Sequence, residues 1–535
     1  MSTWSLETIK ADQIFKPHLG TKAATIFCLL AALLNKSLIA WIYTDLSGDK
    51  SLYLLFAQQL LSGEHPLEPL GLINGQQNYF FNGAITSPLY SFLAAPLLGL
   101  TGSAYATSVI IDVLAWLVFF TGLFRLARLA LGEVWAANLL VLCAGFFLYP
   151  HELQSPPKDV LAVGLILWAV VVLANSVKAP SRSRALLLAC LLIAVGLTKF
   201  LYVPLVLLMV LLLWYFAFNT QANLKATAVV VTLVCVGAFV AFFLYLRYLK
   251  GLHQQTNIEM PPPMDDFQEG FFPQNLTATF PFISSALLNV NFWCTQLADI
   301  LKVPFKTVYR FFQGLDLLLV LPLMFFLKRF VSRSKPAWLI GTLAAAALVC
   351  LLMVMSLRYK AVEYHAGASW THVKESRSFL FVMIVLQVGL FYLVFYSALL
   401  PALKNFLLLL FLIECLHGAY FTTKQVINRQ AVAENLHRGG LHQTVRRLKA
   451  LHANTAVFLS TPNAQLRQLA QVHGIPVAYY AKDRCAIFQT AADRSLLVAL
   501  HQDELFFTGA CVAEKEPDAT EPVAPFMLRY YFNSK

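Results

Sequence analysis

The sequence predicts an all-α polytopic membrane protein of about eleven transmembrane helices, with interfacial helices in its outer loops and a small C-terminal α/β soluble domain. Of the 535 residues, 58% are hydrophobic and only 13% are charged, whereas soluble domains are about 25% charged. Long apolar runs recur along most of the chain, and the basic residues fall mostly in the short loops between them. The net charge of +12 therefore reflects membrane topology, and we exclude nucleic acid as a partner.

The apolar runs give the number of spans, because a helix needs about 17 to 25 apolar residues to cross a bilayer. Such runs lie at 23–43, 104–124, 133–149, 159–177, 185–198, 200–218, 226–248, 313–327, 337–357, 379–400 and 405–421. The run at 185–198 is short. It is counted as a span because of two basic loops, one before residue 185 and one after residue 327. Both loops lie on the cytoplasmic face only if 185–218 crosses the membrane twice. These loops contain Lys178, Arg182 and Arg184, and Lys328, Arg329, Arg333 and Lys335. We therefore expect a short helical hairpin with Lys199 at its outer turn.

The loops on the other face are long and acidic. Residues 44–102 carry four acidic residues and one lysine, and residues 251–301 carry five acidic residues with no lysine or arginine. Residues 51–63 have the spacing of an amphipathic helix that lies on the membrane and stops at Gly63. The first 22 residues show no cleavable signal sequence, so we expect a cytoplasmic N-terminus and a functional outer face.

After residue 423 the pattern changes to that of a soluble α/β domain. We expect strands at 456–459, 477–480 and 495–499 and a helix at 462–473. The predicted division is therefore a transmembrane domain at 1–423 and a soluble domain at 424–535. An odd number of spans places the second domain outside, whereas the basic residues at its start favour the cytoplasm, so its side stays open.

Three short motifs join this organisation to a known family. They are Gly48-Asp49 followed by Tyr53 and Ala57, Pro157-Lys158-Asp159, and Gly196-Leu-Thr-Lys199. Together with the first span, its acidic loop and the following helix, they resemble the GT-C superfamily of membrane glycosyltransferases, such as protein O-mannosyltransferases and aminoarabinose transferases. The resemblance implies a polyprenyl-phosphate sugar donor, inversion of the anomeric centre, an acidic residue of the first outer loop as general base, and an active site on the extracytoplasmic face of a bacterial inner (plasma) membrane.

The chemistry of such a transfer needs a carboxylate that takes the acceptor proton. Asp49 is the preferred base, because Asp45 lies closest to the span and serves as readily as a turn residue. Both are alternatively solvated loop residues. Asp159 is either a second acidic site residue or a favourable charge at the start of a helix.

The leaving phosphate needs cations or a metal. Lys199 is a candidate, because a lysine at the lip of a buried hairpin is costly, although it can also snorkel to the interface. The loop between the ninth and tenth spans supplies further outer cations, of which Arg377 and Arg358 are candidates, and Lys158 precedes Asp159. The sequence shows no metal-ligand set, so a divalent metal stays an open question and no cofactor is assigned.

Two function classes remain. The first is an enzyme that lies among membrane lipids and uses a polyprenyl-phosphate sugar donor. Its acceptor is a lipid, a glycan or a protein. The second is a non-enzymatic flippase or transporter of a lipid-linked glycan. Asp112 and Glu414, with His417 one turn after Glu414, lie inside predicted spans, where a proton relay favours the transporter.

Overall fold

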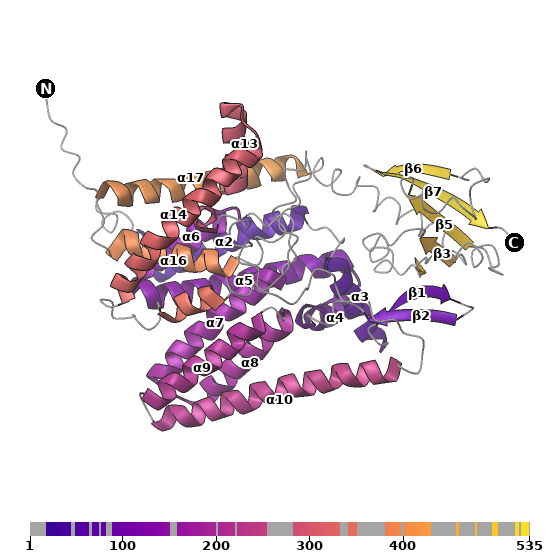
Figure 1. The fold of residues 1–535 in the computed structure, drawn as a ribbon, viewed down its shortest axis with the longest axis horizontal. Coiled ribbons are helices and arrows are strands. Elements are labelled where there is room, and N and C mark those ends of the chain that lie inside the picture. The colour runs from indigo at the N-terminus through magenta and orange to yellow at the C-terminus, as the bar shows by residue number, and fades with distance from the viewer. Residues whose placement is uncertain are drawn as a thin grey trace. The chain divides into compact units, whose positions relative to one another are not determined.

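The computed structural model describes a defined part of the chain (Figure 1). The described residues are 18–43, 49–63, 67–73, 76–81, 88–149, 158–199, 202–219, 222–253, 282–331, 341–349, 380–396, 401–429, 456–459, 477–478, 495–500, 519–523 and 526–533. The chain forms two compact units, which are described separately. The first is Met1–Ala40, Asp112–Phe239 and Asp265–Val426, and the second is Trp41–Ile111, Val240–Met264 and Ile427–Lys535.

The first unit is helical. It holds all or most of α2 (Lys22–Tyr43), α5 (Ala104–Leu131), α6 (Val134–Phe146), α7 (Lys158–Lys178), α8 (Arg182–Thr198), α9 (Val203–Asn219), α10 (Ala222–His253), α12 (Phe282–Leu287), α13 (Val290–Leu301), α14 (Phe305–Val331), α16 (Leu380–Tyr396) and α17 (Pro401–Ile427). A described helix lies on each predicted span, although the span at 337–357 is described only as a helix at 341–349. The polytopic helical class is confirmed, and the count of eleven spans stays a prediction.

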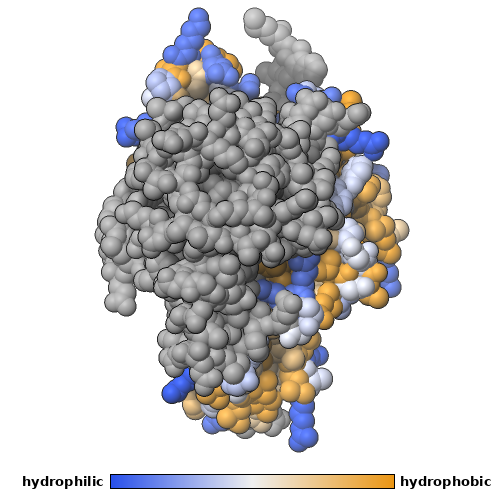
Figure 2. Space-filling view, turned by 90° about the vertical axis from the view of Figure 1, so that its right-hand side faces the viewer, coloured by the Kyte–Doolittle hydropathy of each residue, from blue (hydrophilic) through white to orange (hydrophobic). Residues whose placement is uncertain are grey.

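Five described helices are long and apolar enough to cross a membrane. These segments are Lys22–Ile42, Ala104–Leu131, Asp159–Lys178, Leu224–Tyr248 and Lys404–Ile427. Apolar side chains also remain exposed on the outer faces of α9 and α10, including Leu211, Phe218, Leu233 and Phe243, as expected where lipid replaces water. Hydrophobic residues make up much of the described surface in Figure 2.

The side of the membrane on which each connecting loop lies can be measured. Single cysteines at Ser332 and Gln268, in a background that lacks the nine native cysteines, are expected to react with a membrane-impermeant thiol reagent from opposite faces, because the basic loop is retained inside. A cysteine at Ser181, in the basic loop before α8, serves as the inner-face control. Reaction of Ser332 and Gln268 positions from the same face contradicts the predicted topology.

Helices α7, α8 and α9 pack against one another, and small residues bring α7 close to α5. A Cβ on Gly164 would lie 2.8 Å from the backbone nitrogen of Phe119, and one on Gly122 would lie 3.1 Å from the carbonyl oxygen of Gly164. Such small residues let membrane helices approach at backbone distance. The break between α8 and α9 confirms that 185–218 forms two helices with Lys199 between them.

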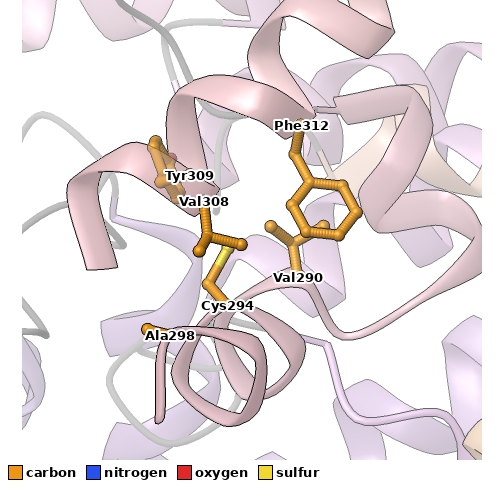
Figure 3. Close-up of a cluster of buried hydrophobic side chains, with 6 residues drawn as sticks. All are labelled: Val290, Cys294, Ala298, Val308, Tyr309 and Phe312. Carbon is orange, nitrogen blue, oxygen red and sulfur yellow. The ribbon is translucent and has the colours of Figure 1, made fainter. Parts of the chain in front are cut away.

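Helices α13 and α14 form a helical hairpin around a small apolar core. Asn289 caps α13 by accepting a hydrogen bond from the backbone of Phe292 (3.2 Å), and Lys302 ends it in a left-handed conformation (φ 53°). Figure 3 shows the residues that meet between the two helices: Val290, Cys294, Ala298, Val308, Tyr309 and Phe312. Burial raises the pKa of the Cys294 thiol to about 12, so this cysteine is a packing residue.

The second unit contains α3 (Asp49–Ser62), which packs against α4 (Leu89–Thr101). The predicted helix at 51–63 is confirmed, but its predicted amphipathic pattern is wrong, and its place on the membrane surface stays a prediction. The five successive residues Tyr53–Ala57 are all buried, and five successive residues surround a helix of 3.6 residues per turn. The rings of Tyr53 and Tyr90 lie 5.1 Å apart. Helix α3 is therefore a packed helix whose partner α4 was not predicted.

The strands of the second unit form two sheets. β1 (Leu67–Ile73) and β2 (Gln76–Phe81) are an antiparallel pair. The other sheet has the order β4-β3-β5-β7-β6, built from β3 (Ala456–Leu459), β4 (Val477–Ala478), β5 (Ser495–Leu500), β6 (Ala519–Val523) and β7 (Phe526–Asn533). β3 is parallel to β4 and β5, whereas β7 is antiparallel to β5 and β6. The predicted strands are present. The helix predicted at 462–473 lies outside the described residues, so the α/β assignment and the 423/424 boundary stay predictions.

Candidate functional site

Two of the sequence-predicted site residues meet in the first unit. Asp159 is the second residue of α7 and is fully buried, and Lys199 directly follows α8. The Nζ atom of Lys199 lies 2.6 Å from Oδ1 of Asp159, although the residues are 40 positions apart. The same Nζ atom lies 5.5 Å from the ring centroid of Tyr202. A buried carboxylate and an aromatic face therefore hold a lysine whose side chain is 12% exposed.

The local sequence explains why the chain turns at Lys199. Its backbone leaves the helical conformation (φ −157°, ψ 110°), while its N–H still donates to the carbonyl of Val195 (3.2 Å). The N–H of Tyr202 donates to the carbonyl of Lys199 (2.9 Å), which closes the turn before α9. Gly196 lets α8 approach Phe239 closely here, because a Cβ would lie 2.5 Å from the tip of that ring. The turn therefore fixes both Lys199 and Tyr202.

Substituting Gly196 tests this packing. Gly196→Ala is expected to lower the free energy of unfolding by about 1–3 kcal/mol, because the new methyl group overpacks the contact with Phe239. The measurement is thermal unfolding of the purified protein in detergent. Gly237→Ala in α10 is the matched control, since nothing lies within 4 Å of its Cβ position, and it is expected to be neutral or slightly stabilising. Equal stability of Gly196→Ala and wild type would contradict the packing argument.

The pair has two physical consequences. A carboxylate in the first turn of α7 also lies at the positive end of the helix dipole, so Asp159 serves the helix and the lysine together. A buried ion pair adds little net stability, but removing one partner leaves a buried charge and costs about 3–5 kcal/mol. Because the lysine keeps some exposure, it can present its positive charge to an anionic group while Asp159 holds it in place.

The remaining predicted site residues are not placed by the structure. Asp49 begins α3 and Lys158 begins α7, but only their backbones are described. Asp45, Arg358 and Arg377 lie outside the described residues. Their roles stay predictions. Among the described residues, no group of three His, Cys, Asp or Glu side chains could hold a metal ion.

The structure adds a residue that the sequence analysis missed and gives a setting to others. Tyr202 was missed, although an aromatic residue three positions after a lysine is a visible signal. Glu414 is fully buried, and its Oε1 accepts a hydrogen bond from the indole of Trp293. The Nδ1 atom of His417 lies 3.6 Å from Oε2 of Glu414, and its ring lies 3.8 Å from that of Phe292. The expected Glu414–His417 proximity is therefore real.

Comparison with known proteins identifies the fold. No protein-family model matches the sequence, and no curated protein matches it. The crystal structure of ArnT from Cupriavidus metallidurans bound to undecaprenyl phosphate is similar with a TM-score of 0.51 and 12% sequence identity, over 95% of this chain and 98% of that chain. The chain has the fold of ArnT. At 12% identity this likeness shows the fold alone, and it supports the fold that the sequence resemblance predicts.

Two further structures resemble the chain. The apo state of ArnT gives a TM-score of 0.47 at 12% identity over 95% of this chain and 98% of that chain. The oligosaccharyltransferase of Archaeoglobus fulgidus in its apo form gives 0.44 at 10% identity over 90% of this chain and 70% of that chain. The likeness to ArnT bound to undecaprenyl phosphate establishes the fold, and the chemistry of this chain has to be argued from its own residues.

Proposed function

We propose that the protein is a membrane glycosyltransferase that moves a sugar from a polyprenyl-phosphate-linked donor to an acceptor at the extracytoplasmic face. The observation that carries the proposal is the ArnT fold along 95% of the chain, with the buried Asp159–Lys199 pair inside it. The ArnT structure contains undecaprenyl phosphate, a lipid phosphate of the kind that leaves in such a transfer. The apolar spans of this chain suit a donor whose tail lies in lipid and whose phosphate lies at the interface.

The proposed reaction is a single displacement that inverts the sugar carbon. A first-loop carboxylate, Asp49 in preference to Asp45, takes the proton of the acceptor group. The acceptor atom then bonds to the anomeric carbon as the bond from that carbon to the phosphate oxygen breaks. The polyprenyl phosphate leaves with the electron pair and the negative charge. A cation placed where this charge develops lowers the barrier.

Lys199 is proposed to supply that cation, and Asp159 is proposed to orient it. This role for Asp159 follows from its contact, since a fully buried carboxylate whose Oδ1 atom holds the lysine is poorly placed to collect a proton from an acceptor. Lys158, Arg358 and Arg377 are proposed as further contacts to the donor phosphate. A divalent metal is not needed for the step as written.

A transporter of a lipid-linked glycan is the second candidate, and one observation favours it. Glu414 lies inside the candidate span Lys404–Ile427, and an ionisable residue inside a membrane is a functional hypothesis by default. However, its hydrogen bond with Trp293 gives the carboxylate a structural reason to be buried there. The enzyme is therefore the preferred proposal.

The deciding experiment is sugar transfer by the purified protein in lipid nanodiscs. A panel of polyprenyl-phosphate sugars is supplied with lipid, glycan and peptide acceptors, and the release of free polyprenyl phosphate is measured. The proposal expects release with at least one donor, dependent on an acceptor. Movement of a lipid-linked glycan across the membrane of vesicles that contain the protein, with no release of polyprenyl phosphate from any donor, would support the transporter.

A further inference from the structure

A lysine is buried within α2 in the first unit. Lys36 lies on α2, within the candidate span Lys22–Ile42, and its side chain is 0% exposed. Its Nζ atom donates a 2.6 Å hydrogen bond to the carbonyl oxygen of Phe147. The same atom lies 5.2 Å from the ring centroids of both Trp116 and Tyr149, which is a cation–π arrangement. A lysine at this position is costly unless it does something specific.

The end of α6 explains what Lys36 does locally. Helix α6 has 13 residues and is therefore about 20 Å long, short of the roughly 30 Å hydrocarbon core. Carbonyl groups at a helix end need partners, especially away from water. Asn35 donates from Nδ2 to the carbonyl of Gly145 (2.9 Å), and Lys36 donates to that of Phe147. Two neighbouring side chains of α2 thus satisfy the end of α6.

Close helix packing makes this arrangement possible. A Cβ on Gly145 would lie 2.3 Å from the Cβ of Ala32, so α2 and α6 touch at backbone distance. On α17, Gly418 packs against the carbonyl of Phe146, and the Cys415 thiol donates to the carbonyl of Cys143 (3.6 Å). The last turn of α6 is held by helices on more than one side, so its geometry is fixed rather than adaptable.

The residues that follow α6 are held as well. The hydroxyl of Tyr149 donates to Oε1 of Gln387 on α16 (2.9 Å), and Nε2 of Gln387 donates to the carbonyl of Ala286 on α12 (3.1 Å). Residues 147–149 are therefore fixed by α2 at one end and by α16 and α12 at the other. Along the chain, residues 150–157 connect Tyr149 to Lys158, the first residue of α7, and Asp159 comes next.

We propose that Lys36 is a positioning residue for the candidate site. It fixes residues 147–149, and Tyr149 is joined through Gln387 to α16, which also packs against α7. The inferred consequence is the placement of Asp159 on α7 and, through Asp159, of Lys199. The positional part of this proposal concerns the structure alone, whereas its effect on turnover rests on the proposed glycosyltransferase function. Lys36 itself is not proposed to touch the donor or the acceptor.

The test combines hydrogen exchange with kinetics. In Lys36→Met, peptides covering residues 143–160 are expected to exchange amide hydrogen at least several-fold faster, while peptides of α13 and α14 are unchanged. The turnover number is expected to fall by up to about 100-fold with KM little altered, the scale for a small misplacement of reacting groups. Lys36→Arg, which keeps a donor, is expected to recover part of both effects. Lys22→Met, at the exposed start of the same helix, is the matched control and is expected to change neither measurement.

Each outcome decides the proposal. Unchanged exchange at 143–160 in a folded Lys36→Met protein overturns it, and so does faster exchange across all helices, which indicates a general packing role. If Lys36→Met does not fold, Lys36→Gln replaces it, because the shorter neutral side chain removes the charged donor to Phe147 and keeps a polar group. Unchanged exchange at 143–160 in that variant also overturns the proposal. If the wild-type protein transfers no sugar, the proposed function fails while the exchange result still decides the positioning role.

Discussion

An Asp49→Asn variant is expected to turn over about 10²- to 10⁴-fold more slowly than wild type, the range typical of losing a general base. Asp49 is the first residue of α3, so changing its carboxylate to an amide removes a helix-dipole interaction worth only about 0.3–1 kcal/mol. The fold and the donor affinity are therefore expected to survive. The measurement is single-turnover sugar transfer in nanodiscs, with donor binding determined separately.

Two further variants make this result specific. Asp45→Asn is expected to have the smaller effect, because Asp45 lies closest to the first span and serves as readily as a turn residue. Asp299→Asn, which changes an exposed carboxylate on α13, controls for the loss of one negative charge and is expected to leave turnover unchanged. Wild-type turnover in Asp49→Asn excludes Asp49 as the base, and a large loss in Asp45→Asn alone transfers the role to Asp45.

The sequence predicts the α8–α9 hairpin well, because two independent signals agree there. Apolar length alone leaves 185–198 doubtful as a span, but the basic loops on either side require an even number of crossings. The structure places the chain turn at Lys199, where the charge argument expects it. Each partner of the Asp159–Lys199 contact is also visible in the sequence, whereas their contact is not, because 40 residues separate them.

Burial is predicted less well than helix positions. The sequence of α3 alone has the pattern of a surface helix. Its residues are buried partly by α4, which has 13 residues and contains Pro96. Helix α4 is too short for the span criterion, so it was not predicted. Lys36 escapes notice for a related reason, because hydropathy averaged over a span hides one lysine among apolar neighbours. What a residue packs against is a tertiary property, and periodicity does not contain it.

The Asp159–Lys199 pair gives the second large effect. Lys199→Gln is expected to weaken binding of the polyprenyl-phosphate donor by about 1.5–3 kcal/mol, the scale of a charge-assisted hydrogen bond. Asp159→Asn is expected to weaken it too, because Lys199 loses the carboxylate that holds its Nζ atom 2.6 Å away. The free energy of unfolding of each single variant is also expected to be lower by about 3–5 kcal/mol, because one charge of a buried pair is left without its partner.

The double variant separates orientation from an independent role for each residue. If Asp159 acts by holding Lys199, then once Lys199 is replaced, removing Asp159 has little further effect on donor affinity, so the two losses are far from additive. Lys178→Gln removes an exposed cation from the other end of α7 and is expected to leave donor affinity unchanged. Additive losses would assign each residue its own contact with the donor. Unchanged donor affinity in Lys199→Gln, together with reduced stability, would show that this lysine is retained for packing and would move phosphate binding to other cations of the chain.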